Sequence, residues 1–256
     1  MIGSGNGCAS HVLAIENLTK RFGALVATDD VSLAVADKTC HALIGPNGAG
    51  KTTLMQQISG TLKPDSGRIW FDGRDITTAS VASRAAAGLG RTFQITAVVP
   101  TFSAHDNAAL AAQAVRGTSF SFFRPAARET DTNAAARDAL DHVGLADRAD
   151  RLAGALSHGE RRLLELAMVL AMKPKLLLLD EPMAGLGKAE TAALTDTLTD
   201  IKRQLPILFV EHDMEAVFAL ADTVTVLVYG ATVSHGAPDV VRADPKARAA
   251  YLGEDA

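Results

Sequence analysis

Residues 45–53 read Gly-Pro-Asn-Gly-Ala-Gly-Lys-Thr-Thr, and this stretch decides the fold. It matches the phosphate-binding pattern GxxxxGKS/T in full. An apolar run over residues 39–44, which favours a strand, precedes it, and a run over residues 54–58, which favours a helix, follows it. The pattern needs this strand–loop–helix context. The stretch therefore predicts a site for the phosphates of a nucleotide.

The chemistry of this loop follows from its residue types. Glycines let backbone N–H groups turn inward onto a polyphosphate, and the helix that follows directs its positive end at the same place. Lys51 can reach the terminal phosphates, and Thr52 can bind Mg²⁺. The residues expected to hold the phosphates are Gly45, Pro46, Asn47, Gly48, Ala49, Gly50, Lys51, Thr52 and Thr53.

Composition limits the partners of the chain. Its 256 residues suffice for one large α/β domain or two small ones, and 48% hydrophobic residues support a full core. A net charge of -4 gives no basic surface for DNA or RNA, so no nucleic-acid partner is expected. No apolar run is long enough to span a membrane. Of two cysteines, Cys40 falls in a predicted buried strand and is interpreted as a core thiol.

Three sections of the chain differ in pattern. Residues 1–10 are rich in Gly and Ser and predict a flexible tail. Short β-prone runs follow at 12–16, 31–35 and 68–71, with a turn at Asp72-Gly73. Alanine-rich helical patterns occupy 104–115 and 128–143. Helices are then predicted at 158–172, 189–204 and 214–220, alternating with strands at 175–179, 207–210 and 223–228, which indicates a parallel sheet with helices on its faces.

A second chemical motif is the run Leu176-Leu177-Leu178-Leu179-Asp180-Glu181, a wholly apolar strand that ends in two acids. Ligand sites in parallel sheets lie at the carboxyl ends of the strands, so both acids should emerge beside the phosphate loop. Neighbouring residues of a strand point in opposite directions and suit two roles. We expect Asp180 to hold Mg²⁺, and Glu181 to act as the general base that activates water.

The segment Leu156-Ser157-His158-Gly159-Glu160 predicts a capping box, in which Ser157 and Glu160 begin a helix. It lies between the phosphate loop and the acidic strand. In this place the sequence resembles the ATP-binding subunits of ABC transporters, whose signature motif LSGGQ stands there. The resemblance extends from about residue 12 to residue 253.

The resemblance implies roles for further residues. Gln94, in Arg91-Thr92-Phe93-Gln94, would contact the metal and link it to the helical part, and His212 would contact the γ-phosphate and hold the water together with Glu181. Phe22 would stack on adenine. Two subunits would face each other head to tail, so that Ser157 and Gly159 of one subunit complete the nucleotide site of the other.

The chain departs from the family pattern at two positions. His158 replaces the first glycine of the signature pair, and Gly187 stands where the family commonly has Asp or Asn. A side chain that would act across the dimer is therefore missing from Ala184-Gly185-Leu186-Gly187. A separate feature, Phe120, Phe122 and Phe123 in one short segment, is either a contact surface for a partner or a loop folded onto the helices, and we favour the loop.

Within the family, the sequence is similar to the importers of branched-chain amino acids. Residues 90–94, 184–186, 210–214 and 251–254 carry this similarity. The expected function is ATP hydrolysis that powers import of branched-chain or related amino acids. The alternatives are a subunit for urea, amides or another solute, a non-transport ABC ATPase, and a regulatory module that does not hydrolyse ATP. Glu181 and His212, which such a module should have lost, are present.

The resemblance implies the fold and the surroundings of the chain. The fold class is α/β, a P-loop NTPase core with a mostly parallel sheet, an antiparallel β part and an inserted helical subdomain. The expected boundaries are 11–99 and 173–256 for the core and 100–172 for the helical subdomain. ATP and Mg²⁺ are the expected cofactors. The partners would be a second ATPase subunit, permease subunits that hold the chain at the cytoplasmic face of the membrane, and indirectly a solute-binding protein.

Overall fold

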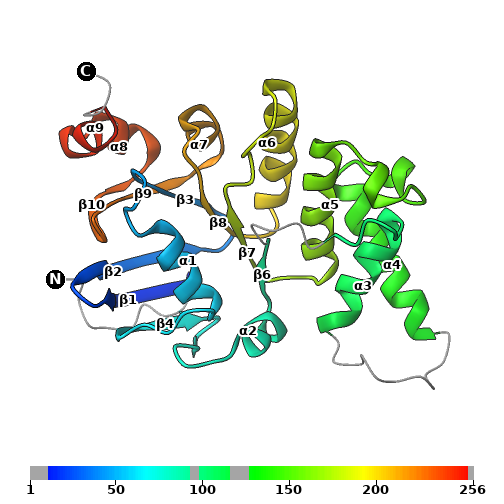
Figure 1. The fold of residues 1–256 in the computed structure, drawn as a ribbon, viewed down its shortest axis with the longest axis horizontal. Helices are drawn as coiled ribbons and strands as arrows, with labels where there is room; N and C mark the ends of the chain where they lie inside the picture. Colours follow the sequence, from blue (N-terminus) through cyan, green and yellow to red (C-terminus); the bar gives the residue numbers. More distant parts are fainter. Residues whose placement is uncertain (1–10, 93–97, 116–126, 253–256) are drawn as a thin grey trace.

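The computed structural model of the chain describes residues 11–92, 98–115 and 127–252. Two sheets form its centre (Figure 1). One has four strands in the order β2-β1-β4-β5, and the other has six in the order β10-β9-β3-β8-β7-β6. Helices cover the second sheet, and the helices α3 to α5 lie together at one end of the molecule. The architecture is the predicted α/β class with an antiparallel part.

The first sheet is antiparallel. Its strands are β1 (His11–Phe22), β2 (Leu25–Ala36), β4 (Ser66–Phe71) and the short β5 (Arg74–Asp75). Alternate residues of β1 and β2 are buried, which is typical of a sheet with one covered face. The predicted strands at 12–16, 31–35 and 68–71 are confirmed. The turn at Asp72-Gly73 is confirmed as well, because both residues have positive φ.

The second sheet is parallel except at one edge. The strands β3 (Cys40–Ile44), β6 (Leu89–Arg91), β7 (Leu176–Asp180), β8 (Ile207–Val210) and β9 (Thr223–Val228) run parallel, and β10 (Ala231–Gly236) pairs antiparallel with β9. Every residue of β3, β7 and β8 is buried. This explains why their sequences are apolar except for His41 and Asp180. Cys40 is buried in β3, as predicted.

Helices connect these strands and pack on the sheets. They are α1 (Lys51–Ser59), α2 (Val81–Ala87), α6 (Lys188–Lys202), α7 (Met214–Leu220), α8 (Pro238–Ala243) and α9 (Pro245–Leu252). The helices predicted at 189–204 and 214–220 correspond to α6 and α7. The last two, α8 and α9, begin at prolines and were not predicted.

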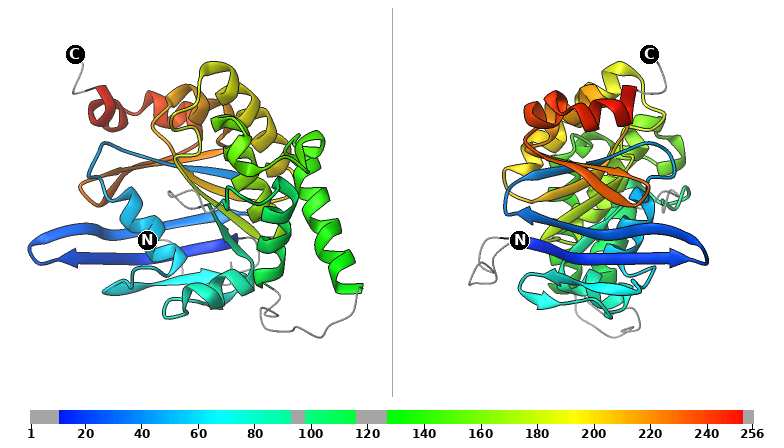
Figure 2. Two further views of the ribbon diagram at one scale, coloured as in Figure 1. Left: turned by 45° about the vertical axis from the view of Figure 1, so that its right-hand side comes forward. Right: turned by 90° about the vertical axis from the view of Figure 1, so that its left-hand side faces the viewer.

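A separate group of helices lies beside the end of the sheet at which β6 and β7 are found (Figures 1 and 2). It consists of α3 (Ala104–Val115), α4 (Ala127–His142) and α5 (His158–Ala171), with short 3-10 turns at Ala146–Arg148 and Ala153–Ala155. Small buried residues such as Ala108 and Ala136 let these helices approach closely. The Phe120–Phe123 segment and the tail 1–10 lie outside the described residues. Within the described ranges, no helix is long and apolar enough to cross a membrane.

Candidate functional site

The loop between β3 and α1 has the geometry of an anion site. Gly45, Gly48 and Gly50 have φ values of 152°, 79° and 102°, which side-chain-bearing residues rarely adopt. Gly50 is the N-cap of α1 and supplies no side-chain hydrogen bond to the first turn. The N–H groups that begin α1 are therefore available to a negatively charged ligand. The strand–loop–helix prediction for residues 39–58 is confirmed.

Neighbouring backbone holds this loop on its outer side. A Cβ at Gly45 would lie 2.1 Å from the carbonyl oxygen of Leu227, and one at Gly50 would lie 2.1 Å from that of Ala27. Gly230 also donates its N–H to the carbonyl of Ala49 at 2.9 Å. The ends of β9 and β2 therefore fix the path of the loop through direct backbone contact.

Lys51 points back into the loop that precedes it. Its ammonium donates to the carbonyl oxygens of Gly45 and Pro46, the second at 3.0 Å. Burial lowers the pKa of Lys51, while the nearby charges of Glu181 and Asp180 raise it. The ammonium therefore lies between the loop and two acidic residues, where it can neutralise phosphate oxygens.

Asp180 is a buried acid at the end of β7. Its side chain is 1% exposed, and within the described part of the chain neither carboxylate oxygen has a hydrogen-bond partner. Burial raises the pKa of Asp180, and Arg91, whose Nη2 lies 3.6 Å from Oδ2, lowers it. A buried carboxylate that lacks hydrogen bonds suits a divalent cation. The residues present therefore fit Mg²⁺, with the exposed hydroxyl-bearing Thr52 at the start of α1 as a second oxygen donor.

Glu181 and His212 lie at the ends of neighbouring strands. Glu181, with φ of 50°, donates its backbone N–H to the carbonyl of Val210 at 2.9 Å. The side chain of His212, the second residue after β8, is 67% exposed. The sheet therefore brings both predicted catalytic residues to the edge where the phosphate loop begins, because β8 pairs with both β3 and β7.

Glu211 is a buried acid for which the sequence pattern predicted no role. One carboxylate oxygen accepts the N–H of Met183 at 2.8 Å, and the other accepts the N–H of His212 at 2.9 Å. It therefore ties the segment after Glu181 to the segment that carries His212. The signal in the sequence was an acid placed directly after the wholly apolar strand β8.

The remaining predicted residues divide into three groups. Phe22 is 50% exposed at the end of β1, with the Lys20 ammonium 5.6 Å from its ring centroid. Ser157 and Glu160 form the predicted capping box, with hydrogen bonds of 3.1 and 2.8 Å. Together with Gly159 they begin α5, which lies on the other side of β6 and β7 from α1 (Figure 1). Gln94 lies outside the described residues.

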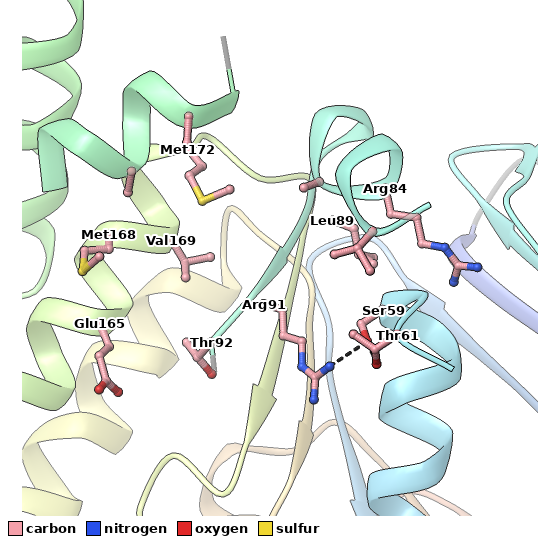
Figure 3. A pocket seen from close by; sticks show the side chains of 14 residues that line it. Ser59, Thr61, Arg84, Leu89, Arg91, Thr92, Glu165, Met168, Val169 and Met172 are labelled. Atoms are coloured by element: carbon pink, nitrogen blue, oxygen red, sulfur yellow. Dashed lines mark hydrogen bonds between the residues drawn. The ribbon is translucent and has the colours of Figure 1, made fainter. Parts of the chain in front are cut away.

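A mostly apolar cavity of about 260 Å³ lies between the core and the helical group (Figure 3). Leu89 and Arg84 line one side. Met168 and Val169 of α5, with Met172 just after this helix, line the other. Arg91 also lines the cavity. It donates to Ser59 at 2.6 Å and lies 3.6 Å from Asp180. One side chain therefore joins this cavity to the buried acid of the site.

Comparisons with known proteins agree with this arrangement. A family model described as "ABC transporter" matches residues 28–184, and one described as "Branched-chain amino acid ATP-binding cassette transporter" matches residues 231–256. The chain is 36% identical over 250 residues to the "High-affinity branched-chain amino acid transport ATP-binding protein BraF" of Pseudomonas aeruginosa, covering 95% of the chain and 98% of that protein.

Two more similarities extend over the same length. The LivG protein of Escherichia coli K12, which has the same description, is 34% identical over 250 residues, covering 95% of the chain and 98% of that protein. A crystal structure of an ATP-binding cassette of an ABC transporter in its ADP conformation superposes with a TM-score of 0.83 at 28% identity. That similarity covers 95% of this chain and 99% of the other.

Proposed function

This chain belongs to the ATP-binding proteins of ABC transporters and is a transporter ATPase, and from that premise we propose that it powers the import of branched-chain or related amino acids. The observation that carries the choice of solute is the match of residues 231–256, which include β10, α8 and α9, to the branched-chain amino acid cassette family. The relatives BraF and LivG, similar along nearly the whole chain, support it.

We propose that the phosphates of ATP bind to the loop 45–53. The uncapped N–H groups of α1 and the Lys51 ammonium would hold them. Thr52, Asp180 and the predicted ligand Gln94 would hold Mg²⁺, which neutralises charge on the phosphates when it is bound. The orphaned carboxylate of Asp180 supports this assignment.

Hydrolysis then needs a base and a group that holds water. Glu181 takes a proton from water, whose oxygen forms a bond to the terminal phosphorus, while the bond to the bridging oxygen breaks and ADP leaves. His212, from the neighbouring strand end, contacts the γ-phosphate and orients the water. Phe22, half exposed at the end of β1, stacks on the adenine ring.

A second subunit completes the site. Ser157 and Gly159 lie at the start of α5, on the far side of β6 and β7 from α1. We propose that these residues complete the nucleotide site of a second copy or a homologous ATPase, and that the facing subunit supplies the equivalent residues in return. Closing the pair places the positive N-terminus of α5 on the γ-phosphate of the facing site.

Permease subunits are the proposed membrane partners, and they hold the chain at the cytoplasmic face. We propose that the permease subunits dock at the apolar cavity between the core and the helical group. Arg91 supports this choice, since it lines the cavity and contacts Asp180, so that a partner bound there can influence the metal site. A solute-binding protein would act on the permeases and not on this chain.

Two variants test the proposal. Lys51→Ala should abolish phosphate release from ATP, whereas Lys188→Ala, at an exposed position, should leave it unchanged. Glu181→Gln should bind ATP without turnover and accumulate a closed dimer on gel filtration. Wild-type turnover by Lys51→Ala would contradict the role of the loop. A Glu181→Gln variant that stays monomeric with ATP and purified permeases would contradict the paired site.

The solute is tested with the partners present. Co-purified complex in proteoliposomes, with its binding protein, should accumulate leucine or a related amino acid when ATP is supplied. Uptake of urea or an amide instead would contradict the proposed solute and leave the ATPase assignment intact.

A further inference from the structure

The segment 184–187 and the first turn of α5 contact each other within one subunit. His158, the first residue of α5, lies over Gly185, where an added Cβ would come within 3.2 Å of Nε2 of its ring. Gly185 has φ of 77°, a conformation that favours glycine. The imidazole therefore covers the middle of the segment.

A second contact joins the same two elements. Oε2 of Glu190, in the first turn of α6, accepts the N–H of Gly187 at 3.0 Å. The other oxygen of this carboxylate covers Gly159, where an added Cβ would lie 2.5 Å from Oε1. Glu190 therefore bridges the end of the segment and the start of α5. Gly187 has no side chain, so Glu190 supplies the capping hydrogen bond from within α6.

Backbone and side-chain bonds continue from this segment to the catalytic residues. Leu186 donates its N–H to the carbonyl of Met183 at 3.1 Å, and Met183 donates its N–H to Glu211 at 2.8 Å. Glu211 accepts the N–H of His212 with its second oxygen. A displacement of the 184–187 segment therefore acts on the loop that carries His212 through contiguous contacts.

We propose that His158 and Glu190 are positioning residues that hold the first turn of α5 and the 184–187 segment as one unit. The proposal rests on the proposed function, because it gives both segments a place against the facing nucleotide. The two departures of this chain then complement each other. Without a side chain at position 187, the segment is oriented from inside its own subunit, by the imidazole at position 158 and the carboxylate at position 190.

Hydrogen exchange in the isolated, nucleotide-free chain tests the contact itself. Glu190→Ala removes the hydrogen bond to the N–H of Gly187 and should speed exchange of that amide by about fivefold, since a hydrogen bond is worth about 1 kcal/mol. His158→Gly uncovers Gly185 without removing a hydrogen bond to it, and should speed exchange of the amides at 185–187 by a smaller factor. Glu190→Gln keeps an acceptor oxygen and should retain the slow exchange. Lys188→Ala, on the same turn, is the matched control. Unchanged exchange in both His158→Gly and Glu190→Ala would overturn the proposal.

Turnover in the assembled transporter tests the positioning role. His158→Gly and Glu190→Ala should lower kcat several-fold with KM for ATP nearly unchanged, and should reduce the Hill coefficient, while Glu190→Gln recovers most of kcat. Faster exchange with unchanged kcat and Hill coefficient would refute a role in hydrolysis. These outcomes are independent of the dimer test with Glu181→Gln, so failure here is distinguishable from failure of the proposed function.

Discussion

Replacing the buried His41 should remove part of the acid sensitivity of the fold. His41 lies in β3, just before the phosphate loop, and is 1% exposed. Its Nδ1 must donate to the carbonyl of Ala34 at 3.2 Å, because a carbonyl can only accept. Nε2 of the neutral ring then accepts a hydrogen bond from the hydroxyl of Thr225 at 2.8 Å. The oxygen of that hydroxyl accepts a hydrogen bond from Nδ1 of His235.

The magnitude follows from the pKa of His41, which burial and then the neighbouring His235 lower to about 4, against 6.5 in an exposed residue. As pH falls, the unfolded chain takes up the proton on His41 before the folded chain does. The contribution of the neutral His41 to the free energy of unfolding is therefore complete above pH 6.5 and disappears toward pH 4. This contribution to the free energy of unfolding is about 3 kcal/mol in full, and about 2 kcal/mol of it is lost between about pH 7.5 and about pH 5.

The assay is urea unfolding followed by far-ultraviolet circular dichroism at both pH values. His41→Gln should be less stable than the wild type at the higher pH, yet should lose about 2 kcal/mol less on acidification, because glutamine does not titrate. His235→Gln, which keeps the buried ring, should retain most of the wild-type loss. Equal losses in the wild type and His41→Gln would refute a neutral, buried His41.

Three further predictions concern single side chains. Arg84→Ala should lower the free energy of unfolding by about 3 kcal/mol or more, because the buried Arg84 side chain donates to two carbonyls at the C-terminal end of α1 and to two more in the segment before α2. Thermal unfolding would measure this loss, and a wild-type melting temperature would contradict it. Glu211→Ala should reduce kcat by about tenfold or more with little change in KM, with Glu211→Gln intermediate; an Ala variant as active as the Gln variant would argue against the bridge from Met183 to His212. Arg91→Ala removes the positive charge that holds down the pKa of Asp180, so the acid limb of the pH–rate profile should move to higher pH, and an unmoved limb would exclude Asp180 as the titrating group.

The sequence predicted the elements that have strong local patterns. The helix 104–115 and the strands 207–210 and 223–228 have their predicted bounds, because their periodicity or apolar run is uninterrupted. The strand β6 was missed. It has three residues, Leu89–Arg91, and is a strand only because it pairs with β7, which lies far away in the chain. The strand β1 is longer than predicted, since a left-handed residue at Asn17 breaks its alternation.

The candidate site divides in the same way. Its phosphate loop and acidic strand end could be predicted because each is a contiguous motif. The contacts of Arg91 with Ser59 and of Glu211 with Met183 join residues about thirty positions apart, and no local pattern specifies them. The position of the His158 imidazole next to Gly185 also depends on how α5 lies against the segment after β7. Such contacts are set by the packing of the elements.

Two different constraints favour glycine in the phosphate loop: the space available for a side chain and the backbone conformation. At Gly45 and Gly50 any side chain would strike the backbone of β9 or β2, whether or not a nucleotide binds. Gly48 has open space around it and only a positive φ of 79°, which Asn or Asp can adopt. A descendant of this chain that no longer used ATP would therefore keep Gly45 and Gly50 for the sake of folding and lose Gly48 first. The residue at position 48, together with Lys51, is then a better mark of a working ATPase than the glycine count of the loop.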